Sequence, residues 1–333
     1  MKHRLAVLAC ALTVTATTAV TAVSASAATR PDPEPRVVAH LDLSRGQTPE
    51  NIALTPDGTA VVTFAAARQV AIIDPEGATR ILATLPAPAD GGVHTPVLGF
   101  PLTSGIVRAH DGTLYFLYAT GTSDLTGLWR MRPGGTPHRI TALPADSLPN
   151  GLALDEHHGR LYMADSALGE IYTVRTSGGP ATTWSAAPEL ASTGFIGVNG
   201  LKLHQGALWA SNLDQGTLVR IPFGPDGRPG HAQVRATGLQ GIDDFAFTGR
   251  GDQILAAIDG PNKVVRVEQD GSSSTVLTGA DGLQNPTSIA VRRGTAYIPS
   301  AAYQTATHPN LMVLPGVGPM GNSGHAPHDH GGR

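Results

Sequence analysis

A unit of two apolar strands separated by a glycine-containing turn recurs along the chain, and it restricts the fold more than any other feature. Each unit starts with a polar residue and ends in a second strand rich in β-branched and aromatic residues. Six units start 44 to 54 residues apart, at Glu50, Ser104, Asn150, Asn199, Asp243 and Thr287. Third and fourth strands follow in most units, as in "GEIYTVRT" and "ATTWSAA". Strands at this density and period are typical of propeller blades, so we predict an all-β, six-bladed β-propeller.

The last unit lacks an outer strand, and the N-terminal region offers one. "RVVAHLDLS", residues 36–44, reads as a strand that precedes the first unit and has no other partner. Pairing it with the last blade would close the ring and remove an exposed sheet edge. No stretch of 10–15 residues shows helical periodicity, which argues against α/β architectures. We therefore expect one propeller domain over residues 36–317.

Both ends of the chain differ in composition from the repeats. Lys2 and Arg4 precede an apolar, Thr-rich run that ends in Ala25-Ser26-Ala27, which predicts a secretory signal peptide over residues 1–27. A membrane anchor is the alternative, although Thr and Ser interrupt the run. Residues 28–35 read as a linker, and the Gly/Pro/His-rich residues 318–333 read as a disordered tail. The single cysteine lies within the signal, so we expect a secreted, extracellular protein without disulfides or thiol chemistry.

The charge balance restricts the partners. The net charge is −3, and removing Lys2 and Arg4 with the signal makes it about −5. This balance, without any basic run, gives no electrostatic reason to bind nucleic acid. We expect a small-molecule substrate, no membrane association after signal cleavage, and a monomer.

The residues that begin the six units form a set of oxygen-bearing side chains. The innermost strand of each propeller blade lines the central channel, so these residues should meet at one end of it. Two are acidic, two are amides and two are hydroxyls, which is the ligand set of a hard cation such as Ca²⁺, or else of another divalent cation. The absence of Cys and His from the set disfavours zinc and copper. For any single position, an Asn or Asp that only caps its own turn is the alternative.

The same residues resemble those of the regucalcin (senescence marker protein) and gluconolactonase family of calcium-dependent six-bladed propellers, with diisopropyl fluorophosphatase and paraoxonase as more distant relatives. In that superfamily a Glu, two Asn and an Asp hold the catalytic calcium. The matching residues here are Glu50 in "PENIAL", Asn150 in "LPNGLAL", Asn199 in "GVNGLKL" and Asp243 in "GIDDFAF". The resemblance covers residues 36–316. It implies a calcium-dependent hydrolase, most simply a lactonase or esterase in which Ca²⁺ polarises the substrate carbonyl. Asp243 is then the candidate general base or nucleophile.

Three departures leave the substrate chemistry open. Asn51 stands where gluconolactonase-like members usually have Gly, and Ser104 stands where paraoxonases carry a catalytic His. The blade 6 entry, Thr287-Ser288, offers no counterpart of the fluorophosphatase channel His. We predict that Ser104 and Thr287 contact the substrate, together with His94 from the long connection between the first two units. A surface role is the alternative for His94.

Further polar residues have two interpretations each. The second strands should return to the ring end of the channel, where their last polar residues either cap turns or contact the substrate: Asp165, Asn212, Asp259 and Ser300. Asp244 should point away from Asp243 because neighbouring residues on a strand face opposite sides. His157 and His158 fall in a turn at the far end. Tyr303 and His308 lie in an insertion that we could assign to neither end.

The competing functional hypothesis is a non-catalytic propeller. In a binding module or scaffold, the ion would only stabilise one end of the channel. Strictosidine synthase-like chemistry is a third hypothesis, but it does not explain a complete set of calcium ligands. Propellers of unrelated function share one architecture, so the fold alone does not decide between these hypotheses.

Overall fold

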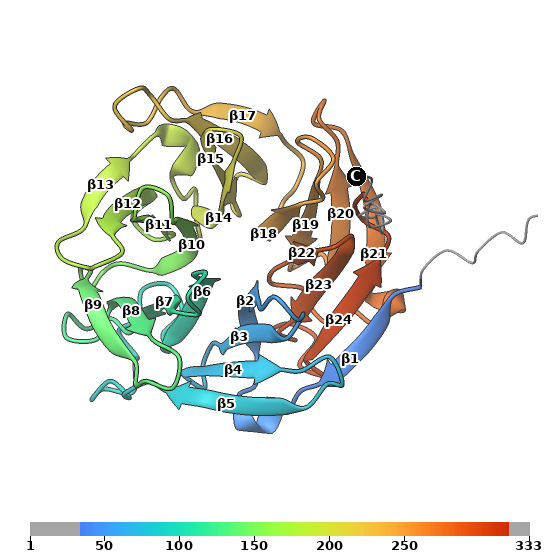
Figure 1. The fold of residues 1–333 in the computed structure, drawn as a ribbon, viewed down its shortest axis with the longest axis horizontal. Coiled ribbons are helices and arrows are strands. Elements are labelled where there is room, and N and C mark those ends of the chain that lie inside the picture. Colours follow the sequence, from blue (N-terminus) through green and yellow to red (C-terminus); the bar gives the residue numbers. More distant parts are fainter. Residues whose placement is uncertain (1–33, 320–333) are drawn as a thin grey trace, which may run out of the picture. The chain divides into compact units, whose positions relative to one another are not determined.

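The computed structural model describes residues 34–319 and shows six four-stranded antiparallel sheets arranged around a central axis (Figure 1). This arrangement confirms the predicted all-β, six-bladed β-propeller. Within these residues the helices are three short 3-10 turns, η1 (Leu43–Arg45), η2 (Pro188–Leu190) and η3 (Gly279–Asp281). The predicted signal peptide lies outside the described residues. So do the linker before residue 34 and the tail beyond residue 319.

Each of the first three blades is a meander of four consecutive strands, in which the first strand lies nearest the axis (Figure 1). Blade 1 contains β2 (Pro49–Leu54), β3 (Ala60–Phe64), β4 (Gln69–Ile73) and β5 (Thr79–Thr84). Blade 2 contains β6 (Leu102–Arg108), β7 (Leu114–Ala119), β8 (Gly127–Met131) and β9 (His138–Ala142). Blade 3 contains β10 (Pro149–Asp155), β11 (Arg160–Asp165), β12 (Glu170–Arg175) and β13 (Thr182–Ser185).

The next two blades repeat this order, and the last blade closes the ring. Blade 4 contains β14 (Val198–His204), β15 (Ala207–Asn212), β16 (Thr217–Pro222) and β17 (Gln233–Ala236). Blade 5 contains β18 (Ile242–Phe247), β19 (Ile254–Ile258), β20 (Lys263–Val267) and β21 (Ser273–Thr278). Blade 6 contains β22 (Ala290–Arg292), β23 (Thr295–Ser300), β24 (Asn310–Pro315) and β1 (Arg36–His40).

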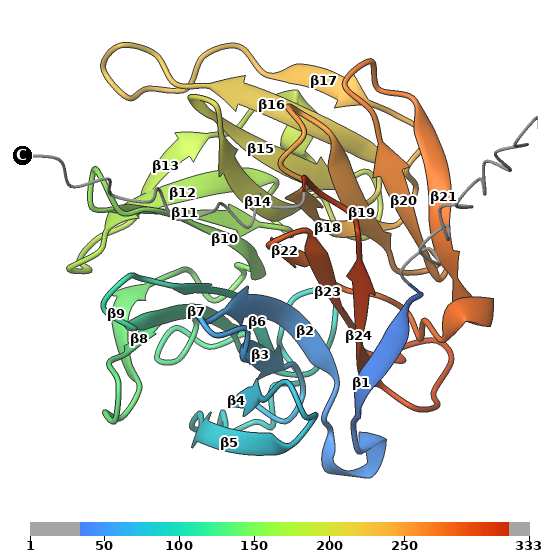
Figure 2. The same ribbon diagram turned by 45° about the vertical axis from the view of Figure 1, so that its right-hand side comes forward.

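The N-terminal strand completes the last blade, as predicted. β1 pairs antiparallel with β24, from Arg36 opposite Val313 to His40 opposite Asn310, and the two strands lie side by side in Figure 2. Residues about 270 positions apart therefore share one sheet, and β1 covers the outer edge of β24. No helix among residues 34–319 combines the length and apolarity needed to cross a membrane.

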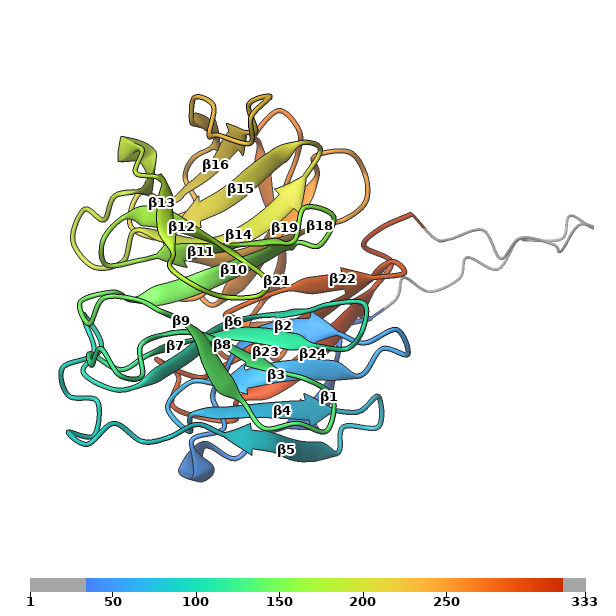
Figure 3. The same ribbon diagram turned by 60° about the vertical axis from the view of Figure 1, so that its left-hand side comes forward.

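The hydrophobic core lies between neighbouring sheets. Tyr162 and Ile171 of blade 3, for example, pack in one buried cluster with Leu201 and Leu208 of blade 4. Similar clusters join every other pair of neighbours, including the first and last blades. Figure 3 shows blades 1 and 2 stacked next to each other from the side. Because each sheet buries both faces, the six inner strands are fixed around the channel.

An irregularity interrupts the inner strand of each of the first five blades at the residue that begins the repeat. In β10, Pro149 pairs with Asp165 and Leu152 with Met163, so the intervening Asn150 leaves the regular ladder. Equivalent register shifts occur in β2, β6, β14 and β18. A bulge redirects side chains. The local backbone thus aims the starting residues of the repeats toward the channel.

The residue after the starting position determines how closely two inner strands approach. A Cβ atom on Gly151 would lie 2.0 Å from the carbonyl oxygen of Asn199, and one on Gly105 would lie 2.2 Å from that of Asn150. Only glycine permits this approach. Blades 1, 5 and 6 instead carry Asn51, Asp244 and Ser288 at the equivalent position. These side chains meet one another in the channel, as described below.

Candidate functional site

The four predicted metal ligands are buried at the starts of four inner strands. Glu50 and Asp243 are 6% and 7% exposed, and Asn150 and Asn199 are also buried. The side-chain amide of Asn199 donates to Asp243 Oδ1 at 2.9 Å, which joins blades 4 and 5. The Asn150 side chain makes no hydrogen bond to any residue between 34 and 319. The structure therefore places an acid–amide pair and a further buried acid and amide around this end of the channel.

Ser104 and Thr287, the two hydroxyl residues among the six that begin the repeats, support the predicted ligands. Ser104 Oγ donates to the carbonyl oxygen of Pro149 at 2.7 Å, and Thr287 Oγ1 donates to that of Pro49 at 2.8 Å. Each hydroxyl thus fixes the backbone directly before a predicted ligand on the neighbouring blade. Both residues are fully buried. Substrate contact by Ser104 and Thr287 remains a prediction, and their visible role is to position Asn150 and Glu50.

Burial makes the carboxyl groups of this region difficult to ionise. It raises the pKa of Glu50 to about 7, and the charges of Asp259 and Asp244 act in the same direction, while the hydrogen bond from Tyr303 opposes them. Burial, followed by the charge of Glu50, raises the pKa of Asp243 well above its usual range. Burial alone raises the pKa of Asp259 to about 7. Perturbed carboxyl groups of this kind are characteristic of functional sites.

In the part of the chain that the structure describes, these three carboxyl groups form no salt bridge. Within residues 34–319, no Lys, Arg or His nitrogen lies within 4.0 Å of Glu50, Asp243 or Asp259. Carboxylate and amide oxygens are the donors that Ca²⁺ prefers. The donor types of Glu50, Asp243, Asn150 and Asn199 are those that Ca²⁺ binds, but no three His, Cys, Asp or Glu residues among residues 34–319 lie close enough together to hold a metal ion by themselves.

Asp244 lies next to Asp243 in the sequence but belongs to a separate network. Lys202 Nζ contacts both of its carboxylate oxygens at 2.7 Å. Ser288 Oγ donates to it at 2.7 Å, and the amide of Asn51 donates at 3.2 Å. Asp244 therefore points away from Asp243, as expected, and it bonds side chains from blades 1, 4 and 6. The same network gives the side chain of Asn51 a partner, at the position where blades 2, 3 and 4 carry glycine.

Two of the four second-strand residues cap turns, as one of the two interpretations predicts, and substrate contact by the other two stays a prediction. Asp165 Oδ1 accepts three backbone N–H groups, from Leu148, Ala167 and Leu168, and so caps its turn. Asn212 also bonds backbone, through Glu189, Ala191 and Gln215. Asp259 Oδ1 instead is buried without a hydrogen-bond partner among the described residues. Ser300 Oγ is buried and unpartnered there too.

Sequence reasoning missed the roles of Tyr303 and Lys202. Tyr303 lies in the loop between β23 and β24, and its hydroxyl donates to Glu50 Oε2 across 253 residues. Lys202 lies on β14 and points toward blade 5. The only sequence signal for Lys202 was its place two residues after Gly200, on the strand that lines the channel. No local signal identifies the target of Tyr303, because the contact depends on closure of the ring.

The histidines lie away from the ring. His94 is 75% exposed at its side chain and pairs with Asp90 at 2.7 Å, so its predicted contact with the substrate has no visible support and remains a prediction. His157 and His158 lie in the exposed turn between β10 and β11, where His158 contacts Asp155 at 2.7 Å. His308 is exposed in the β23–β24 loop.

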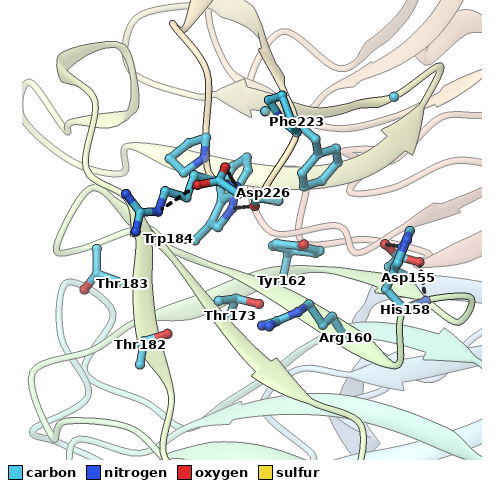
Figure 4. A pocket seen from close by; sticks show the side chains of 16 residues that line it. Asp155, His158, Arg160, Tyr162, Thr173, Thr182, Thr183, Trp184, Phe223 and Asp226 are labelled. Carbon is cyan, nitrogen blue, oxygen red and sulfur yellow. Dashed lines mark hydrogen bonds and ion pairs between the residues drawn. The ribbon is translucent and has the colours of Figure 1, made fainter.

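A cavity of about 820 Å³ lies between blades 3 and 4, lined by residues of β10 to β13 and by the β14–β15 turn and the β16–β17 connection. Figure 4 shows Tyr162, Trp184 and Phe223 along it, with ring centroids 5.2 to 5.5 Å apart. Its two carboxylates are already paired, Asp155 with His158 and Asp226 with Arg228. This cavity therefore suits a binding role better than catalysis.

No protein-family model and no curated protein matches this sequence. Among solved structures, the fold is similar to that of regucalcin, a calcium-binding protein from Agrobacterium tumefaciens (TM-score 0.61, 18% identity, covering 84% of this chain and 93% of that one). It is also similar to a gluconolactonase from Xanthomonas campestris (0.60, 16%, 85% and 96%). A third similar structure is virginiamycin B lyase from Staphylococcus aureus (0.55, 16%, 84% and 100%). These likenesses support the predicted resemblance at the level of the fold, which is the propeller shared with regucalcin and gluconolactonase.

Proposed function

We propose that this protein is a secreted, calcium-dependent hydrolase that acts on a lactone or a related ester. The observation that carries this proposal is the buried set of Glu50, Asp243, Asn150 and Asn199, which combines calcium-type donors with carboxyl groups lacking a protein cation. The solved structures called regucalcin and gluconolactonase support it by their similar fold. The composition of residues 1–27 supports secretion.

The site residues have separate roles in this hydrolysis. A calcium ion held by the donor set would polarise the carbonyl oxygen of the substrate. Asp243 would accept a proton from the water whose oxygen attacks the carbonyl carbon. The ring C–O bond then breaks, and the leaving alkoxide takes up a proton to give the hydroxy acid. The Asn199 amide, bonded to Asp243 at 2.9 Å, holds the carboxyl group in place.

The test combines metal binding with turnover. Calcium affinity is measured by calorimetry, and hydrolysis by pH-stat over a panel of lactones, esters and organophosphates. We expect Asp243→Asn, or chelation of calcium, to lower turnover at least about 100-fold. Asp226→Asn is the matched control, because Asp226 is exposed beside the distant cavity. A turnover rate that is unchanged both by chelation of calcium and by Asp243→Asn would overturn the mechanism.

Secretion needs its own measurement. Expression of the full chain in a host with a secretion pathway should yield extracellular protein whose N-terminus, found by mass spectrometry, is Ala28. Intact protein retained inside the cell would contradict the proposal.

A non-catalytic binding propeller is the second candidate. The aromatic cavity between blades 3 and 4 favours it, because stacked rings and threonine hydroxyls there suit recognition of a ligand without chemistry. Tight calcium retention without turnover on any substrate would support this alternative.

A further inference from the structure

We propose that the cavity between blades 3 and 4 binds a small organic anion, a molecule with a carboxylate, sulfonate or phosphate group on an apolar body, and that Arg160 contacts the anionic group. This inference names the ligand class for the binding role suggested above for that cavity, and it does not depend on the calcium-dependent hydrolase. The volume of about 820 Å³ is that of a small-molecule site, since such pockets measure roughly 300–1,000 Å³.

Two arginines lie opposite each other on blade 3 without a counter-ion. Arg160 is the first residue of β11 and lines the cavity, and Arg175, the last residue of β12, is its direct partner in the strand ladder. Opposed residues share one face of a sheet, and like charges in this position destabilise it. Among residues 34–319, no carboxylate oxygen lies within 4.0 Å of either guanidinium group. A bound anion would neutralise this pair.

The carboxylate that could neutralise Arg160 is bonded elsewhere. Asp155 of β10 is the partner of Arg160 in the strand ladder. Its Oδ1 instead accepts the backbone N–H of His158 at 3.0 Å, and its Oδ2 contacts His158 Nδ1 at 2.7 Å. Figure 4 shows the guanidinium group of Arg160 directed away from this pair. Asp226, the other carboxylate of the cavity, contacts Arg228 at 3.0 Å. Within the described residues, both carboxylates thus have other partners, and Arg160 is available to an anion.

The wall beside Arg160 suits an organic molecule better than an inorganic ion. Tyr162 lies two residues further along β11 and therefore on the same face of the sheet. Its ring packs against those of Trp184 and Phe223, with centroids 5.3 and 5.5 Å away. Thr182 is exposed on the same wall, where its hydroxyl can donate a hydrogen bond. A cation next to an apolar wall is complementary to an anionic group on an apolar body.

Two fluorescent probes that differ only in charge test the ligand class. Anilinonaphthalene sulfonate carries a negative charge on an apolar ring system, and phenylnaphthylamine is the same ring system without the sulfonate. Both are titrated, in chelator, into the wild type, Arg160→Gln and Arg80→Gln, which changes an exposed arginine on β5. We expect Arg160→Gln to weaken the sulfonate about 10-fold and the neutral probe less than about 2-fold, because only the sulfonate accepts charge-assisted hydrogen bonds. Arg80→Gln should change neither affinity by more than about 2-fold.

Thermal unfolding without probe separates ligand binding from a structural role. Arg160→Gln should unfold at the wild-type temperature or higher, because it removes the repulsion from Arg175. A lower unfolding temperature, with equal losses of affinity for both probes, would make Arg160 purely structural. Equal sulfonate affinity in the wild type and Arg160→Gln would overturn the role of Arg160. Equal affinity of the wild type for both probes would overturn the preference for an anion, and failure to bind either would overturn the cavity as a binding site. Since chelator is present throughout, none of these outcomes decides the calcium-dependent hydrolysis.

Discussion

Asp243 and Asp244 are adjacent in the sequence, yet the two regions of the channel that they face differ in how charge is balanced. On the Asp244 side, the ammonium group of Lys202 and donors from Ser288 and Asn51 surround the carboxylate. On the Asp243 side, the buried carboxyl groups of Glu50 and Asp243 and the partly buried one of Asp259 have no Lys, Arg or His nitrogen within 4.0 Å among the described residues.

The difference separates an acid that the protein itself neutralises from acids that it does not. A buried carboxylate that has its counter-ion within the protein completes the fold and has nothing left to bind. Buried carboxylates without one remain available to an external cation. By the same reasoning, the channel end is a better candidate for a cation site than the aromatic cavity between blades 3 and 4, whose carboxylates are already paired.

The largest predicted effect concerns the Asp244 side of the channel, where Lys202 neutralises the carboxylate. Lys202→Met leaves Asp244 as a buried charge without its cation, so we expect the free energy of unfolding to fall by about 3–5 kcal/mol. Denaturant unfolding measures this loss. The double variant Lys202→Met/Asp244→Asn should recover part of it, because the uncompensated charge is gone. A double variant no more stable than Lys202→Met would show that Lys202 acts by packing alone.

The carboxyl groups on the Asp243 side predict that the free energy of unfolding depends on pH. The folded-state pKa of both Glu50 and Asp259 is about 7, above the ordinary carboxyl values of the unfolded chain. The native state therefore holds protons that the unfolded state releases, and stability falls as pH rises from about 4 to about 7. The loss is roughly 3 kcal/mol for one such carboxyl group.

Denaturant unfolding in chelator at several pH values measures this slope. Asp259→Asn should reduce it, and saturating calcium should largely remove it. A slope that is identical in wild type and Asp259→Asn would contradict the assigned burial cost.

Calcium should stabilise the protein through the Asp243 side only. A ligand present at about 100 times its dissociation constant adds about 2.7 kcal/mol to the free energy of unfolding. Thermal unfolding should show this shift in the wild type and in Lys202→Met. Asp243→Asn should lose it. A calcium shift that survives Asp243→Asn would place the ion elsewhere.

The smallest effect concerns the hydroxyl groups that position the ring. Thr287→Val removes the hydrogen bond to the Pro49 carbonyl oxygen, so we expect a loss of about 1–2 kcal/mol in stability and a few-fold weaker calcium binding. Thr173→Val is the control, because Thr173 Oγ1 bonds the Leu161 carbonyl oxygen within blade 3. It should cost similar stability with unchanged calcium affinity. Equal affinities in both variants would limit Thr287 to a structural role.

Much of the fold was predictable from the sequence because its signals are local and repeated. Alternating strands, glycine turns and the period of the repeat do not depend on distant contacts. The lone N-terminal strand at Arg36–His40 could be assigned to the last blade because a closed ring needs a partner for that edge. The starting residues of the six repeats were found in the same way, from their shared phase.

The contacts of the candidate site were less predictable. Asp165 ends β11 and Asp259 follows β19, and the two read alike in the sequence, yet Asp165 caps its turn while Oδ1 of Asp259 has no hydrogen-bond partner among the described residues. Tyr303 reaches Glu50 only because the sixth blade lies beside the first. Lys202 selects Asp244, and not Asp243, because the bulge in β18 sends the two acids in different directions.

The sequence by itself thus determined the propeller, the number of its blades and the residues that begin its inner strands, since periodicity encodes all three. Only the tertiary structure decided which carboxylates are neutralised by the protein and which are not. Charge compensation acts between side chains that the closed ring brings together from far apart in the chain, and no local pattern records those distances.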